Sequence, residues 1–258
     1  MMHDIKVYNA DELSQKEFPE EEWLLKPFLT RGGDWLVAGE EDACKSLFLL
    51  QLCIHASLGY DFHMVEVEKP RKIIYIGADD SAREVQKRLF ALNTTGTPLN
   101  DNLKLICQPS IDFNIRGCEQ IMRWVDDYDP DILIFDHLTA YVIGGTNDPN
   151  GMHDYGVLKR DIKSRDKGVI AVTHFNRTTE GSKNDPLIRR VGGNKSILAD
   201  HGVITLHDKI SEASIGHGKQ VGLEAYRTKN DGGKKGQYDT SFEISVNTQT
   251  GKTLFKEM

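Results

Sequence analysis

Short apolar segments rich in β-branched residues alternate with longer segments of helical periodicity through most of the chain. The predicted strands are Asp34–Ala38, Lys72–Ile76, Leu103–Ile106, Ile132–Phe135 and Val169–Thr173. The predicted helices between them are Lys45–Leu58, Ala82–Leu92, Gly117–Tyr128 and Met152–Arg165. Because this alternation is typical of strands joined by crossover helices, it predicts an α/β fold with a mostly parallel, twisted sheet and flanking helices.

The pattern changes after residue 200, where apolar segments follow one another without a long helix between them. These segments are Gly202–Leu206, Val221–Arg227 and Phe242–Val246. They predict a C-terminal antiparallel extension of the sheet. Gly144–Gly151 and Thr178–Gly193 are rich in Gly, Asn, Asp and Pro, which predicts mobile loops. Residues 1–22 are predicted to form an acidic arm, and residues 23–258 a single domain.

Composition is that of a globular domain rather than of a membrane or disordered chain. Hydrophobic residues make up 39% and charged residues 28%, which are ordinary proportions for a folded protein. The longest apolar stretch, Leu47–Leu58, is interrupted by Gln51 and His55, so no membrane span is predicted. The acidic first residues do not predict a signal peptide. The four cysteines form no CxxC pair, which argues against a structural zinc site and favours reduced thiols in a cytoplasmic protein.

Charge is unevenly distributed along the chain. The net charge of −7 argues against a uniformly basic nucleic-acid binder. Residues 176–195, however, hold basic side chains against only two acids, Glu180 and Asp185. These basic residues are Arg177, Lys183, Arg189, Arg190 and Lys195. The segment is either a phosphate-binding loop or an ordinary solvated surface loop.

A strand, a loop and a helix start follow one another at residues 34–58, and the loop carries most of a phosphate-binding motif. Gly39–Ser46 fits G-x-x-x-x-G-K-[ST] except that Cys44 replaces the second glycine. The candidate nucleotide-binding residues are Gly39, Glu40, Glu41, Asp42, Ala43, Cys44, Lys45 and Ser46. In such a loop, backbone N–H groups surround the phosphates, Lys45 reaches them, and the Ser46 hydroxyl binds Mg²⁺. The alternative is a chance Lys-Ser pair at a helix start.

Two features of this loop weigh against ordinary nucleotide affinity. Cys44 adds a Cβ where the backbone approaches the ligand, a position at which glycine is preferred. Glu40, Glu41 and Asp42 place three carboxylates on a loop meant for an anion. They would repel a triphosphate if they point inward and would be screened if they point outward.

Acidic and imidazole side chains follow the ends of neighbouring predicted strands. Asp136 ends a buried strand, as a Mg²⁺-directed Walker B aspartate does, although many strands end in Asp. Asp79 and Asp80 follow the Lys72–Ile76 strand, where an acid could orient the attacking water. Asp80 is predicted to serve instead as the N-cap of the next helix. His174 ends another strand at the edge of the same site, although a lone His is more often structural.

In this order the motifs resemble those of the RecA/DnaB-type hexameric ATPases, especially the RepA-like plasmid and phage replicative helicases. Those proteins are AAA-type P-loop ATPases with a single RecA-like domain. The resemblance covers about residues 18–256 and includes the lead-in Trp23–Leu29 and Arg31–Asp34. It implies that Asp79 stands where the family has its catalytic glutamate, as a shorter general base.

The resemblance also covers the second half of the chain. Thr173–Arg177 looks like the strand-end motif that precedes the DNA-binding loop, which implies that His174 senses the γ-phosphate. Arg190–Asp200 is similar to the segment that closes this loop. Arg227 and Lys229 resemble the family's K-x-R pair in reversed order, which implies that they reach a neighbouring subunit's nucleotide, with Lys229 at the finger position.

Three functions therefore stay open. The first is a Mg²⁺-dependent ATPase that forms a homo-oligomeric ring, a hexamer, and acts on single-stranded DNA in replication or recombination. The second is a nucleotide-binding or DNA-binding assembly subunit with a degenerate, slow or inactive phosphate loop. The third is a RecA-like recombination ATPase. The fold does not decide among them, because one scaffold serves many activities.

Overall fold

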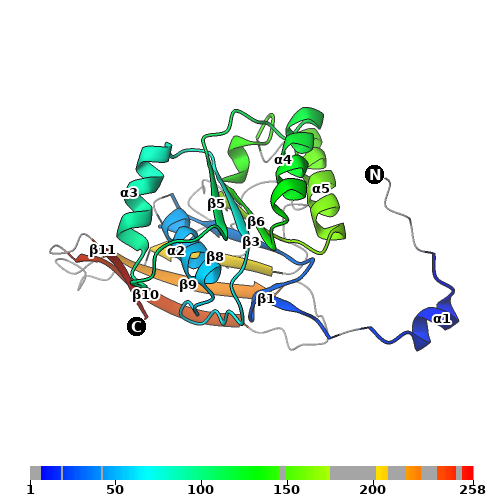
Figure 1. The fold of residues 1–258 in the computed structure, drawn as a ribbon, viewed down its shortest axis with the longest axis horizontal. Coiled ribbons are helices and arrows are strands. Elements are labelled where there is room, and N and C mark those ends of the chain that lie inside the picture. The colour runs from blue at the N-terminus through cyan, green and yellow to red at the C-terminus, as the bar shows by residue number, and fades with distance from the viewer. Residues whose placement is uncertain are drawn as a thin grey trace, which may run out of the picture.

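The main feature of the fold is a nine-stranded sheet with the order β11-β10-β9-β8-β3-β7-β6-β4-β5 (Figure 1). The computed structural model describes residues 7–18, 20–41, 43–145, 149–174, 202–208, 219–227, 237–247 and 252–257. The strands are β3 (Asp34–Gly39), β4 (Ile73–Gly77), β5 (Leu103–Cys107), β6 (Ile132–Asp136), β7 (Gly168–His174), β8 (Gly202–Asp208), β9 (Lys219–Arg227), β10 (Gln237–Asn247) and β11 (Lys252–Glu257). The strands predicted from residues 34 to 173 are all present, and their ends shift by one residue at most.

The sheet is parallel from β8 to β5 and antiparallel from β8 to β11. β3 lies between β8 and β7, and β7 separates it from β6. The predicted antiparallel extension therefore begins one strand later than expected, because β8 pairs with β3 in parallel register. The extension also gains β11, which the sequence pattern did not indicate.

Helices cover both faces of the sheet (Figure 1). They are α2 (Lys45–Leu58), α3 (Ala82–Leu92), α4 (Ile115–Tyr128) and α5 (Pro149–Ser164), with a short 3-10 turn η1 (Leu138–Ala140) after β6. α2 contributes to the apolar core on one face, where α3 packs beside it, and α4 and α5 form the core on the other face. α2 and α3 have the predicted bounds, whereas α4 starts at Ile115, two residues earlier than predicted, after an Asn114 cap.

The predicted mobile loop Gly144–Gly151 is partly wrong, because α5 already begins at Pro149. Proline is well suited to a first helical position. Gly151 is a packing residue rather than a loop signal, since a Cβ there would lie 2.4 Å from the carbonyl oxygen of Ile143. The predicted loop Thr178–Gly193 lies outside the described residues.

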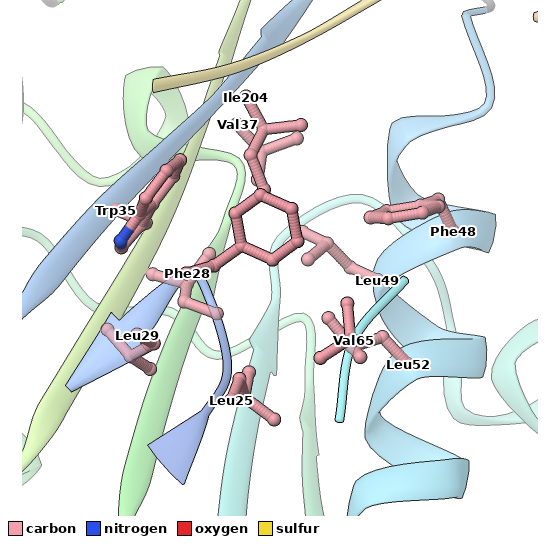
Figure 2. A pocket seen from close by; sticks show the side chains of 11 residues that line it. Leu25, Phe28, Leu29, Trp35, Val37, Phe48, Leu49, Leu52, Val65 and Ile204 are labelled. Atoms are coloured by element: carbon pink, nitrogen blue, oxygen red, sulfur yellow. The ribbon is translucent and has the colours of Figure 1, made fainter. Parts of the chain in front are cut away.

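The segment before β3 packs against the strand and the helix that flank the candidate phosphate loop. It contains the hairpin β1 (Trp23–Leu25) and β2 (Leu29–Thr30). Phe28, from the turn of this hairpin, packs edge-on against Trp35 of β3, with ring centroids 5.1 Å apart. Figure 2 shows Phe28 pointing between Val37 of β3 and Leu49 of α2, in a pocket lined only by apolar side chains.

A short helix, α1 (Ala10–Gln15), precedes the first hairpin and has no buried residues. It stands away from the sheet and its helices in Figure 1. Within the described part of the chain, none of the helices combines the length and the apolar character that crossing a membrane requires.

Candidate nucleotide-binding site

The candidate phosphate loop joins the central strand β3 to the first turn of α2, at the carboxyl edge of the parallel strands. Ligands of open α/β sheets bind at this edge. Gly39 ends β3 and lies in register with His174 of β7 and Leu206 of β8. A Cβ on Gly39 would come within 2.3 Å of the carbonyl oxygen of Leu206, so only glycine fits there.

Cys44, which replaces the second glycine of the motif, adopts a conformation that favours glycine. Its φ of 59° and ψ of 24° are left-handed, and it occupies the N-cap position of α2. Its side chain makes no capping hydrogen bond to the helix. The loop thus keeps a glycine-like backbone turn at the start of α2 despite the added side chain.

Lys45 is buried, and its ammonium group faces the loop and β7. The Nζ atom donates to the carbonyl oxygens of Glu40, at 2.6 Å, and Gly39, at 3.3 Å. It also lies 3.2 Å from Nδ1 of His174. Three acceptors therefore gather around one cation at the position where a phosphate-binding lysine is expected.

His174 is held in its neutral form by its surroundings. Burial lowers the pKa of this imidazole to about 4, and the positive charge of Lys45 and the neighbouring His137 act in the same direction. A neutral ring accepts a hydrogen bond from Lys45 at Nδ1, and its proton then lies on Nε2. The His137 ring packs edge-on against His174, with centroids 4.6 Å apart.

Asp136 ends β6 beside the start of α2, and its carboxylate is buried. A small pocket holds Asp136, Ser46 and Asp79 together. Its complete lining is Ser46, Leu50, Tyr75, Gly77, Ala78, Asp79, Asp80, Val85, Arg88 and Asp136. Tyr75 of β4 donates a hydrogen bond from its hydroxyl to Oδ2 of Asp136. The strand pattern alone does not single out Tyr75. The signal in the sequence is a tyrosine within a buried strand, because a buried tyrosine hydroxyl usually needs a hydrogen-bond partner.

The two acids that follow β4 have different environments. The Asp79 side chain is 71% exposed, and its Oδ2 lies 3.7 Å from Nε2 of His137. Asp80 forms an ion pair with Arg88 of α3. The predicted N-cap role of Asp80 is wrong, because Ser81 caps α3 and completes a capping box with Glu84.

The acidic residues of the loop do not all face the site. Glu41 is exposed, which favours the screened, outward orientation for this residue. Glu40 is half-buried and contributes its backbone carbonyl to Lys45. Asp42 lies outside the described residues.

Of the predicted finger pair and DNA-binding residues, the described structure contains only Arg227. Arg227 is the last residue of β9 and pairs with Gly202, whereas the loop end of β3 is level with Leu206. Arg227 is therefore placed toward the opposite end of the sheet from Gly39. The remaining predicted residues, which lie outside the described part of the chain, are Lys229, Arg177, Lys183, Arg189, Arg190 and Lys195.

Comparison with known proteins identifies the family. A family model described as an AAA domain (AAA_25) matches residues 5–180. This match spans more than half of the sequence, and the chain belongs to this AAA domain family. The comparison with curated proteins gives no match.

Solved structures share the fold at low sequence identity. One is the KaiC-like protein PH0186 from the hyperthermophilic archaeon Pyrococcus horikoshii OT3, with a TM-score of 0.58, 13% identity, and coverage of 90% of this chain and 93% of that one. Another is the flagellar accessory protein FlaH from Methanocaldococcus jannaschii, with a TM-score of 0.53, 16% identity, and coverage of 88% and 90%. Together with the sheet order, these matches confirm the predicted RecA-like α/β fold.

Proposed function

We propose that this protein is a Mg²⁺-dependent ATPase of the RepA/DnaB type that forms a ring and acts on single-stranded DNA. The observation that carries the proposal is the arrangement of Lys45, His174 and Asp136. His174 and Asp136 end the neighbouring strands β7 and β6, and Lys45, the first residue of α2, reaches back to Gly39 at the end of β3. A pocket lined by Ser46 and Asp136 lies beside the start of α2.

The residues present fit a nucleotide and its metal ion. Gly39 and the left-handed Cys44 leave a backbone cradle at the N-terminus of a fourteen-residue helix, which favours phosphate. Within the described residues no group of three or more His, Cys, Asp or Glu side chains could hold a metal. Mg²⁺ does not need one, because it usually takes one or two protein oxygen ligands together with phosphates and waters. Ser46 and Asp136 would supply those ligands.

The chemistry follows from the charges at this edge. Lys45 would exchange its bonds to the Gly39 and Glu40 carbonyls for phosphate oxygens, and neutral His174 would offer a donor at Nε2. Asp79 is the proposed general base that orients water, since it is exposed at the mouth of the same pocket. Bound Mg²⁺ would neutralise charge on the phosphoryl group in transfer.

Ring formation is supported by the placement of Arg227. Its position toward the far end of the sheet excludes a role at its own chain's phosphate loop, because Arg227 pairs with Gly202 and not with residues level with Gly39. A role for Arg227 at nucleotide therefore requires a neighbouring subunit. We propose Lys229 as the finger residue on the basis of the motif alone.

The DNA-binding part of the proposal rests on sequence charge. Residues 176–195 carry five basic side chains against two acids, and they come soon after β7, whose last residue, His174, lies at the nucleotide edge. We propose that Arg177, Lys183, Arg189, Arg190 and Lys195 contact the phosphates of single-stranded DNA.

The test is ATP turnover with and without single-stranded DNA, together with light scattering on a sizing column with and without ATP and Mg²⁺. The proposal expects DNA-stimulated turnover and a nucleotide-dependent rise to the mass of a ring. A protein that stays monomeric and whose ATP turnover does not change with single-stranded DNA would contradict the proposed function.

The second candidate, an assembly subunit with a slow or inactive loop, is supported by a specific observation. Cys44 holds a left-handed conformation with a side chain present, and the acid proposed as general base is the shorter Asp79. Nucleotide binding without turnover, in either the presence or the absence of DNA, would favour this candidate.

A further inference from the structure

Tyr75 is the buried neighbour of the proposed metal ligand. It lies in the middle of β4, next to β6, and only 5% of its surface is exposed. Its hydroxyl donates a hydrogen bond to Oδ2 of Asp136, and that interaction does not use the other carboxylate oxygen. Both residues line the pocket that also contains Ser46.

The register of the two strands explains how the hydroxyl reaches the carboxylate. Tyr75 pairs with Ile134, and Gly77 pairs with Asp136. The side chain of Tyr75 must therefore extend along β4 toward the level of Gly77 to bring its hydroxyl to the Asp136 carboxylate. Gly77 lies on the same face of β4 and has no side chain in the way. A Cβ at Gly77 would stand 3.2 Å from Cε1 of Tyr75, which is closer than ordinary contact.

We propose that Tyr75 is a positioning residue that orients the Asp136 carboxylate for Mg²⁺, with Gly77 leaving room for its ring. This inference rests on the proposed function, since it assumes that Asp136 faces the metal. A hydrogen bond to one oxygen of a carboxylate fixes its rotation and directs the other oxygen, as outer partners of metal ligands commonly do.

The test compares the affinity of the full chain for a fluorescent ATP analogue in Mg²⁺ and in EDTA. The variants are Tyr75→Phe, Gly77→Ala, Asp136→Asn and the matched control Tyr141→Phe. Tyr141 is a good control because it is also buried, but it donates its hydroxyl to the backbone oxygen of Ile76 and not to the Asp136 carboxylate. Thermal melts of all variants separate folding from binding.

For the wild type, Mg²⁺ is expected to raise affinity, and Asp136→Asn should remove this gain. Tyr75→Phe should lower the affinity for the ATP analogue in Mg²⁺ by about 10- to 100-fold. If Mg²⁺ raises the wild-type affinity by less than this factor, the variant should lose the whole increase. The affinity in EDTA should stay unchanged. Gly77→Ala should lower the affinity in Mg²⁺ in the same direction, and Tyr141→Phe should leave it intact.

The outcomes separate the two claims. A full Mg²⁺ gain in Tyr75→Phe, with Asp136→Asn still defective, would overturn the role of Tyr75 and leave the proposed function standing. An equal loss in Tyr75→Phe and Tyr141→Phe would also overturn it, since that pattern is general destabilisation. Absence of nucleotide binding by the folded wild type would contradict the proposed function and this inference with it.

Discussion

Replacing Cys44 with glycine isolates the conformational cost built into the phosphate loop. A side chain in the left-handed region costs about 1–2 kcal/mol, and Cys44 stands there with a φ of 59°. Glycine removes this strain but adds about 0.5–1 kcal/mol of backbone entropy cost. Cys44→Gly should therefore be more stable than Cys44→Ala by about 0.5–1 kcal/mol, because alanine keeps the strained Cβ and both variants lose the thiol.

The assay is urea or thermal unfolding of the two variants, with the same pair of substitutions at Cys118 as a control. Cys118 lies inside α4, where glycine is about 1 kcal/mol less favourable than alanine. The sign of the glycine-minus-alanine difference should thus be opposite at the two cysteines. For a chain of this size, Cys44→Gly should melt about 1–4 °C higher than Cys44→Ala.

The same glycine should bind nucleotide more tightly than the alanine variant, since a Cβ is removed where the backbone approaches phosphate. If Cys44→Gly is less stable than Cys44→Ala, or binds nucleotide more weakly than the wild type, the account of this loop is refuted.

Two further predictions concern pH and DNA. The pKa of His174 falls from an ordinary 6.5 to about 4 in the folded chain. Between pH 6.5 and pH 4, His174 is therefore protonated in the unfolded chain and neutral in the folded chain. The contribution of neutral His174 to the free energy of unfolding is therefore fully present above pH 6.5 and is lost as pH falls toward 4. In urea melts at pH 5 and 7.5, His174→Gln should lose less stability at the lower pH than the wild type does. An unchanged pH dependence in this variant would contradict a buried, neutral His174. Replacing Arg189 and Arg190 with alanine should weaken binding of a labelled single-stranded oligonucleotide and flatten its log–log salt slope by about 1.4, at 0.7 per lost phosphate contact. Unchanged affinity in that double variant would refute the DNA-binding assignment.

The sequence predicted the sheet and the phosphate loop well, for a physical reason. Buried parallel strands are apolar on both faces, so Ile132–Asp136 and its neighbours stand out as continuous apolar segments. The start of α2 at Lys45 is fixed by the motif, and its end by Gly59, which adopts a left-handed C-cap.

The errors come from contacts between segments far apart in the sequence. The parallel pairing of β8 with β3 depends on spatial neighbours that no local pattern encodes. Gly151 resembles a loop residue until Ile143 is seen to pack against it. Tyr75 gains its interest only when Asp136 is placed beside it, 61 residues further along the chain.

The central claim is that the edge carrying Lys45 hydrolyses ATP, and turnover of Lys45→Ala tests it most directly. Lys104→Ala is the control, since Lys104 is a partly exposed lysine that pairs with Asp101 on the surface. In Mg²⁺ and ATP, Lys45→Ala should lose all turnover while thermal melts show that it still folds, and Lys104→Ala should match the wild type. Wild-type turnover in folded Lys45→Ala would contradict the claim.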